Sequence, residues 1–268
     1  MSEESKIDLV VIKTICKTLL AIFVIVGFAF VSVCAFNPKV ASEYASKNAQ
    51  AVLYEKTYRK SGQIVDLYNA IEINLSTEKY FVASKLIEEM KARDDYSEFC
   101  NKVNQSAISQ TTEKSMLVLV ADYDAYLTSQ LVKSYYLSNF TEKAEELASR
   151  ELTANSNIYD WCFGTYVDCV ATDKLLTQEE RQEALKAIYI KLYNNLSVDQ
   201  AVNNNINALG NPEMLSGLNK CLAYYQMIKI KKTQRILMFA NGQDINDISE
   251  EIETLIDKYD DSVAALAW

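Results

Sequence analysis

An uninterrupted apolar stretch at residues 19–36 constrains the fold of this chain more than any other feature. Its sequence, LLAIFVIVGFAFVSVCAF, contains no charged residue. As an α-helix rising about 1.5 Å per residue, it would extend for roughly 27 Å, close to the hydrocarbon thickness of a bilayer. We therefore predict a transmembrane signal-anchor helix at residues 19–36, a short cytoplasmic segment at residues 1–18, and one large domain at residues 37–268.

The charges before this stretch predict its orientation. Lys6, Lys13 and Lys17 precede it, and basic residues hold the flank that carries them in the cytoplasm. We therefore expect a single-pass membrane protein with a cytoplasmic N-terminus and an extracytoplasmic main domain. A signal peptide that is cleaved after Ala35 remains the alternative.

Few glycines and prolines indicate the fold class of the large domain. The chain has six Gly and two Pro, too few for the many tight turns of a sandwich or barrel. We predict an all-α domain of nine to eleven helices. Capping signals and hydrophobic spacing place these helices at about 37–59, 63–73, 77–92, 94–108, 112–137, 141–152, 158–175, 177–193, 197–210, 212–240 and from 247 onward. Asn37-Pro38 and a capping box of Thr177 and Glu180 mark helix starts, and Gly62 and Gly242 mark helix ends. In the helix at 77–92, the residues expected to face inward are Phe81, Ala83, Leu86, Ile87 and Met90.

Three stretches of this domain, 64–91, 125–152 and 161–193, share a plan. Each has an aromatic or apolar helix, a polar turn, and then a charged helix with a central alanine. The residues that carry the pattern are Leu67, Ala70, Ile71, Ala83 and Ile87 in the first stretch and Leu131, Tyr135, Ala144 and Ala148 in the second.

This pattern resembles tetratricopeptide-type helical-repeat proteins over about a third of the chain. The chain departs from that family because the usual glycine and closing proline are missing and the third stretch has a longer turn. The resemblance implies an array of α-hairpins whose curved surface holds a peptide or protein segment. An irregular helical bundle is the alternative architecture.

The composition excludes several classes of function. The chain has no histidine, which removes Ser-His-Asp and Cys-His catalysis and most zinc sites. Its net charge of −9 disfavours nucleic acid as a partner. We predict no catalytic residue, cofactor or metal, and expect a membrane-anchored scaffold or adaptor that binds a protein or peptide.

The alternative function is a secreted or membrane-bound hydrolase with an all-α fold that uses carboxylates. Two pairs of acids, Asp122 with Asp124 and Asp168 with Asp173, are close enough in sequence to be considered. Paired carboxylates perform hydrolysis when they converge in a cleft at about 5 to 9 Å. Acids with these spacings on helices are usually solvated.

Aromatic residues are the candidates for partner binding. The chain has 17 Tyr, a residue type that suits both binding surfaces and half-buried positions between helices. The predicted partner-binding residues are Tyr123, Tyr126, Tyr135, Tyr159, Trp161 and Tyr166.

Three smaller groups of residues leave alternatives open. The cysteines Cys100, Cys162, Cys169 and Cys221 are expected to be small buried side chains, with a distant disulfide as the alternative. A basic patch formed by Lys229, Lys231, Lys232 and Arg235 suits either an acidic partner or lipid headgroup, or a solvated helix face. Four glycosylation acceptor patterns begin at Asn74, Asn104, Asn139 and Asn195.

Overall fold

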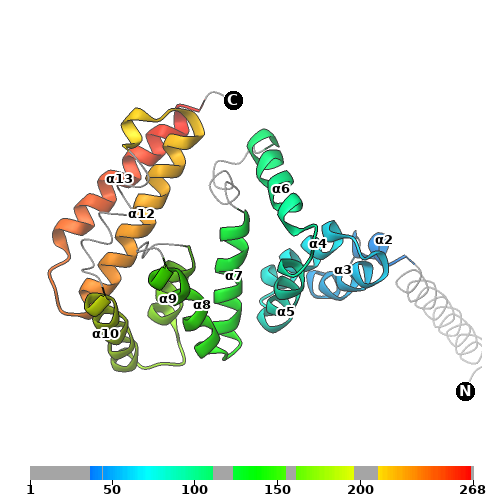
Figure 1. Cartoon of the computed structure of the whole chain (residues 1–268), viewed down its shortest axis with the longest axis horizontal. Coiled ribbons are helices and arrows are strands. Elements are labelled where there is room, and N and C mark those ends of the chain that lie inside the picture. Colours follow the sequence, from blue (N-terminus) through cyan, green and yellow to red (C-terminus); the bar gives the residue numbers. More distant parts are fainter. Residues whose placement is uncertain (1–36, 44, 111–122, 155–160, 196–210, 267–268) are drawn as a thin grey trace, which may run out of the picture. The chain divides into compact units, whose positions relative to one another are not determined.

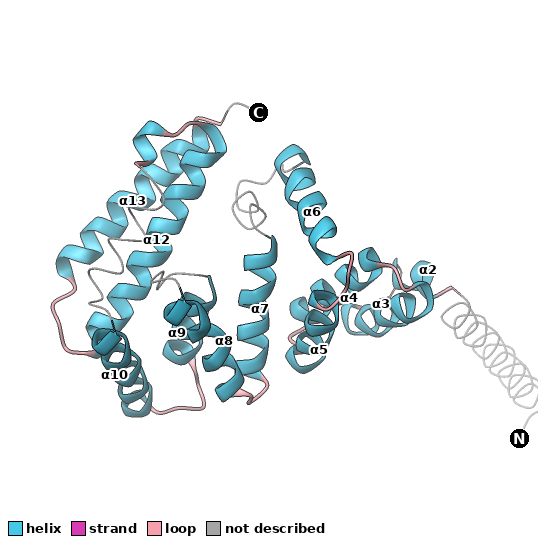
Figure 2. Cartoon of the chain, viewed as in Figure 1, coloured by secondary structure: helices cyan, strands magenta, loops and turns pink. Residues whose placement is uncertain are grey.

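The computed structural model describes residues 37–43, 45–110, 123–154, 161–195 and 211–266. These residues form eleven α-helices and one 3-10 helix, with no β-strand among them (Figure 2). The all-α prediction is therefore confirmed. The predicted transmembrane segment at 19–36 lies outside the described residues, and none of the helices inside them is long and apolar enough to cross a bilayer.

The chain divides after Lys79 into two compact units, whereas the sequence predicted one domain at 37–268. The first unit contains α2 (Pro38–Glu43), α3 (Lys47–Ser61) and α4 (Ile64–Ser76). In this unit α3 packs against both α2 and α4. The division falls between the two helices of the first predicted repeat, because α5 (Tyr80–Lys91) belongs to the second unit.

The second unit is organised around two helices. The helix α7 (Tyr123–Leu137) contacts α5, α6 (Tyr96–Gln110), α8 (Thr141–Ala154) and α9 (Trp161–Thr172). The helix α12 (Gly217–Ala240) contacts α9, α10 (Gln178–Asn195), the 3-10 helix η1 (Pro212–Met214) and α13 (Asn246–Ala264). Because α9 contacts both α7 and α12, it joins the two halves of the unit (Figure 1).

The α7–α8 hairpin shows how the sequence ends one helix and turns the chain into the next. Asn139 adopts a left-handed conformation with a φ of 63°, which asparagine tolerates better than most residues. The backbone N–H of Phe140 then donates to the carbonyl of Tyr135 at 2.9 Å and ends α7. Ala144 and Ala148 are both 0% exposed, so α8 buries its small residues. That these hairpins follow a tetratricopeptide plan stays a prediction.

Two predicted helices are interrupted. The helix expected at 37–59 begins at Pro38 as predicted but forms two helices, because Ser46 is extended and α3 begins after it. The helix expected at 212–240 starts as a separate turn of 3-10 helix at Pro212–Met214, and α12 begins only at Gly217, after an extended Ser216. Serine is compatible with a helix interior and also caps helix starts, so the sequence did not distinguish these breaks.

The predicted turn between the helices of the first repeat is displaced. Asn74 was expected in the turn, but it lies in α4, is 1% exposed, and donates to the carbonyl of Ala70 at 2.8 Å. The chain turns instead at Glu78, which has a φ of 58°.

Phe81 was predicted to point inward, but it is exposed and stacks on Phe140 with ring centroids 6.0 Å apart. The other predicted inward residues of α5, Ala83, Leu86, Ile87 and Met90, are buried as expected.

The four downstream cysteines are buried and form no disulfide, which matches the prediction of small apolar side chains. Burial raises the pKa of the Cys169 thiol to about 11. This thiol is therefore protonated at neutral pH and is a poor nucleophile.

Candidate partner-binding site

Three of the six aromatic residues predicted to bind a partner are buried in the packing between helices. Tyr123, Tyr135 and Tyr166 are buried, with at most 9% of each exposed. Tyr126 is half-buried and its ring lies 6.0 Å from that of Tyr123. Trp161 is the first residue of α9, and Tyr159 lies outside the described residues. Tyr126 is the member of this set whose described position leaves area for a partner.

Buried tyrosine hydroxyls connect helices across the second unit. Tyr135 on α7 donates to the carboxylate of Glu88 on α5. Its neighbour Tyr136 donates to Oδ2 of Asp173 at 2.8 Å. Burial raises the pKa of Tyr166 to about 12, so this hydroxyl also stays neutral. These contacts favour the interpretation that the tyrosines fill half-buried positions between helices.

Two of the four carboxylates considered for hydrolysis, Asp124 and Asp173, have other hydrogen-bond partners. Asp124 accepts hydrogen bonds from Lys91 and, at 2.6 Å, from the Tyr96 hydroxyl. Asp173 accepts the Tyr136 hydroxyl, and Asp168 lies at an exposed position on α9. Asp122 lies outside the described residues. Within the described part of the chain, no group of three or more His, Cys, Asp or Glu side chains is arranged to hold a metal ion.

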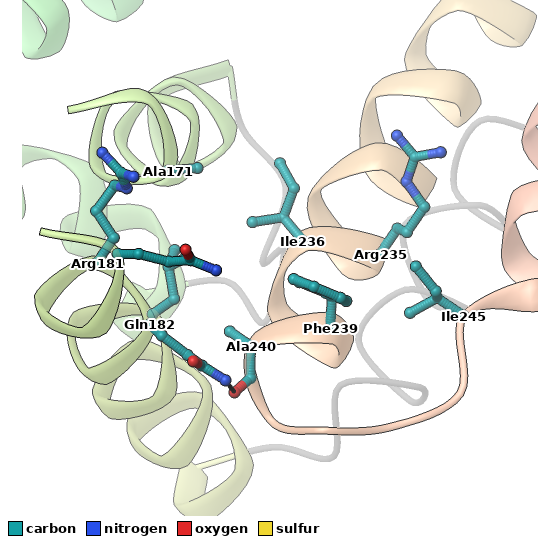
Figure 3. Close-up of a pocket in the computed structure, with 10 residues that line it drawn as sticks. Ala171, Arg181, Gln182, Arg235, Ile236, Phe239, Ala240 and Ile245 are labelled. Carbon is teal, nitrogen blue, oxygen red and sulfur yellow. Dashed lines mark hydrogen bonds between the residues drawn. The ribbon is translucent and has the colours of Figure 1, made fainter. Parts of the chain in front are cut away.

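A pocket that the sequence did not reveal lies between α9, α10 and α12. It has a volume of about 400 Å³, which falls within the usual range for ligand sites. Figure 3 shows the side chains that surround it. The lining residues are Ala171, Gln178, Arg181, Gln182, Leu185, Arg235, Ile236, Phe239, Ala240 and Ile245.

The last turns of α12 form one wall of this pocket. Arg235 and Phe239 are four residues apart, a spacing that places both side chains on the same face of a helix. Phe239 is 64% exposed although its neighbour Leu237 is only 1% exposed. The helix therefore buries one apolar side chain in the core and leaves another at the pocket.

The opposite wall comes from the start of α10, where the predicted capping box is confirmed. Thr177 Oγ1 accepts the Glu180 backbone N–H at 3.2 Å, and the Glu180 carboxylate accepts the Thr177 N–H at 2.8 Å. The next residue, Arg181, donates to the carbonyls of Asp173 at 2.5 Å and Leu176 at 3.1 Å. These bonds hold the α9–α10 loop and fix the Arg181 side chain across the pocket from Arg235 (Figure 3).

A further contact joins the two walls. Gln182 Nε2 lies 3.5 Å from the carbonyl of Ala240 and donates to it, as the dashed line in Figure 3 shows. The carbonyl is near the end of α12, where the last helical carbonyls lack a partner in the helix. The contact therefore satisfies a free acceptor and ties α10 to α12 at one end of the pocket.

The four residues of the predicted basic patch have different surroundings in the structure. Lys231 is 12% exposed in its side chain and pairs with Glu251 on α13 at 2.9 Å. Lys229 lies over the ring of Tyr225 at 5.8 Å, and Lys232 is exposed. Arg235 alone of these four residues lines the pocket. The spacing of Arg235, Ile236 and Phe239 was the sequence signal for this wall, but it does not reveal the facing helix.

The pocket is suited to binding. Its described lining residues comprise apolar side chains, two arginines and two glutamines, and include no carboxylate, hydroxyl or thiol. Comparisons with protein-family models, with curated proteins and with solved structures gave no match.

Proposed function

We propose that this chain is a membrane-anchored helical module that binds a protein or peptide partner and performs no chemistry of its own. The observation that supports this proposal is the exposure of Phe239 beside an apolar pocket of about 400 Å³. Large apolar side chains exposed together with a concave surface are typical of interaction sites. The partner covers Phe239 and fills the pocket between α9, α10 and α12.

Photo-crosslinking tests this role directly. A photoreactive phenylalanine analogue placed at position 239 of the full chain, and irradiated in native membranes, is expected to give a discrete adduct with one protein. Met214 provides the control position, because it is apolar and 83% exposed but does not line this pocket. The absence of an adduct at position 239, or the same adducts from position 214, would contradict the proposal.

The membrane anchor is the second part of the proposal. It rests on the charge-free stretch at 19–36 and on Lys13 and Lys17 just before it. The protein is expected to stay with membranes during alkaline carbonate extraction and to retain residues 1–35. A mature protein that starts at Phe36 would show that the stretch is a cleaved signal.

A further inference from the structure

The pocket between α9, α10 and α12 presents positive charge in an acidic chain. The net charge of the protein is −9, yet both charged residues that line this pocket are arginines, Arg181 and Arg235. Figure 3 shows them on opposite sides of the cavity. The local charge at the site is therefore opposite to that of the whole chain.

The two guanidinium groups differ in their remaining hydrogen-bonding capacity. Arg181 already donates to two backbone carbonyls, of Asp173 and Leu176. Arg235 forms no hydrogen bond or ion pair with another described residue. A guanidinium has five N–H donors in a fixed plane and binds a carboxylate through two parallel hydrogen bonds. The geometry therefore leaves Arg235 ready to receive an anion.

Apolar surface lies directly beside this cation. Phe239 and Ile236 belong to the same turns of α12 as Arg235, and Ile245 and Leu185 line the cavity near them. Because Phe239 is 64% exposed, a small ligand confined to the cavity would leave much of its ring in water. A longer chain that continues over the ring would cover it. This favours a peptide segment over a free small molecule.

We infer that the pocket binds a peptide segment in which a bulky apolar side chain is flanked by an aspartate or glutamate. The apolar side chain packs against Phe239 and Ile236, and the carboxylate binds Arg235. This inference rests on the proposed function and specifies the chemistry of the partner. Charge complementarity favours an acidic peptide as the occupant, because the charged residues of the pocket are arginines. Elsewhere, the net negative charge of the chain repels acidic peptides.

A charge-swap selection tests the inference. The full chain in nanodiscs is used to select from a display library of random nine-residue peptides, in parallel with the variants Arg235→Gln and Arg235→Glu. The wild type is expected to enrich peptides with an acidic residue next to an aromatic or large aliphatic one. Arg235→Gln is expected to lose the acidic preference, and Arg235→Glu to enrich lysine or arginine at that position.

Affinity measurements on one selected peptide, by fluorescence anisotropy, add the matched control. Lys232→Glu changes the net charge as much as Arg235→Glu and lies one turn away on α12, but Lys232 does not line the pocket. Arg235→Glu is expected to weaken binding at least tenfold and Lys232→Glu less than threefold. Circular dichroism of each variant checks that the helices are retained.

Three results would overturn the inference. One is an acidic preference that persists in Arg235→Glu, and another is an equal loss of affinity in Lys232→Glu. The third is Arg235-dependent binding of dodecanoate without enrichment of any peptide, which would assign the pocket to small anionic amphiphiles. If position 239 still crosslinks to a partner protein while the selection shows no acidic preference, the proposed binding function is supported. The inferred preference for an aspartate or glutamate at Arg235 is then wrong.

Discussion

Glu72 lies on α4 with its carboxylate oxygen Oε1 buried, and no described residue donates a hydrogen bond to that oxygen. Burial raises the pKa of this carboxyl from 4.5 to about 7. The folded state then holds a proton that the unfolded chain releases near pH 4.5. The contribution of Glu72 to the free energy of unfolding therefore falls as the pH rises from about 4.5 to about 7, and this contribution is level on either side.

Glu72→Gln removes this titration and is expected to leave stability nearly unchanged at pH 4. At pH 8 the variant is expected to be more stable than the wild type by about 1–3 kcal/mol, because each pKa unit corresponds to about 1.4 kcal/mol. Thermal unfolding of the full chain in detergent, followed by circular dichroism at both pH values, measures the difference. Glu55→Gln on α3 is the control for loss of one negative charge, and an equal gain in that variant would contradict the assignment to Glu72.

Leu237 is expected to contribute to stability, whereas Phe239, two residues later on α12, is expected to contribute to binding. Leu237→Ala is expected to lower the free energy of unfolding by about 2–5 kcal/mol, because Leu237 is 1% exposed and its loss leaves a cavity. Phe239→Ala is expected to change it by less than about 1 kcal/mol, since most of that ring is already in water. Denaturant unfolding of the two variants tests this; a large loss in Phe239→Ala would assign the ring to packing.

At the scale of helices, two helix ends are closed by non-glycine residues in the left-handed region. Glu78 follows α4 with a φ of 58°, and Asn139 follows α7 with a φ of 63°. Glutamate is strained there, whereas asparagine is tolerated and glycine is favoured. Glu78→Gly is therefore expected to raise the free energy of unfolding by about 0.5–1 kcal/mol. Asn139→Gly is expected to change it by no more than a few tenths, and thermal unfolding of both variants distinguishes them.

The start of α10 depends on its capping box. Thr177→Ala removes the acceptor for the Glu180 N–H and is expected to cost about 1 kcal/mol. Thr177→Ser keeps the hydroxyl and is expected to retain most of that stability. Hydrogen exchange of the Glu180 amide is the measurement, and faster exchange in the alanine variant alone is the expected result.

Helix ends were predictable from sequence where the cap has one dominant conformation. Gly62 and Gly242 both have a positive φ and end α3 and α12 as expected. The pairs Asn37-Pro38 and Thr177-Glu180 also begin helices as predicted. The break at Ser46 was not predicted, because a serine at this position is equally compatible with a continuous helix.

At the scale of the whole molecule, sequence predicted which faces are buried but not which helices meet. Leu67, Ala70 and Ile71 form the expected buried stripe of α4. The sequence predicted that the other helix of the same repeat would cover this stripe, but α4 packs on α3. A hydrophobic stripe has no information on the identity of the helix that covers it. The second unit's pocket was not predicted for the same reason, because Ala171, Arg181 and Phe239 come from three helices that meet only in the fold.

Asp173 has a consequence for the rate at which the α9–α10 loop opens. Its carboxylate accepts the Leu175 backbone N–H and the Tyr136 hydroxyl, both at 2.8 Å, while its carbonyl accepts Arg181. The Leu175 amide therefore exchanges its hydrogen with solvent only when the loop opens. A partner that fills the proposed pocket beside Arg181 is therefore expected to slow the exchange of the Leu175 amide.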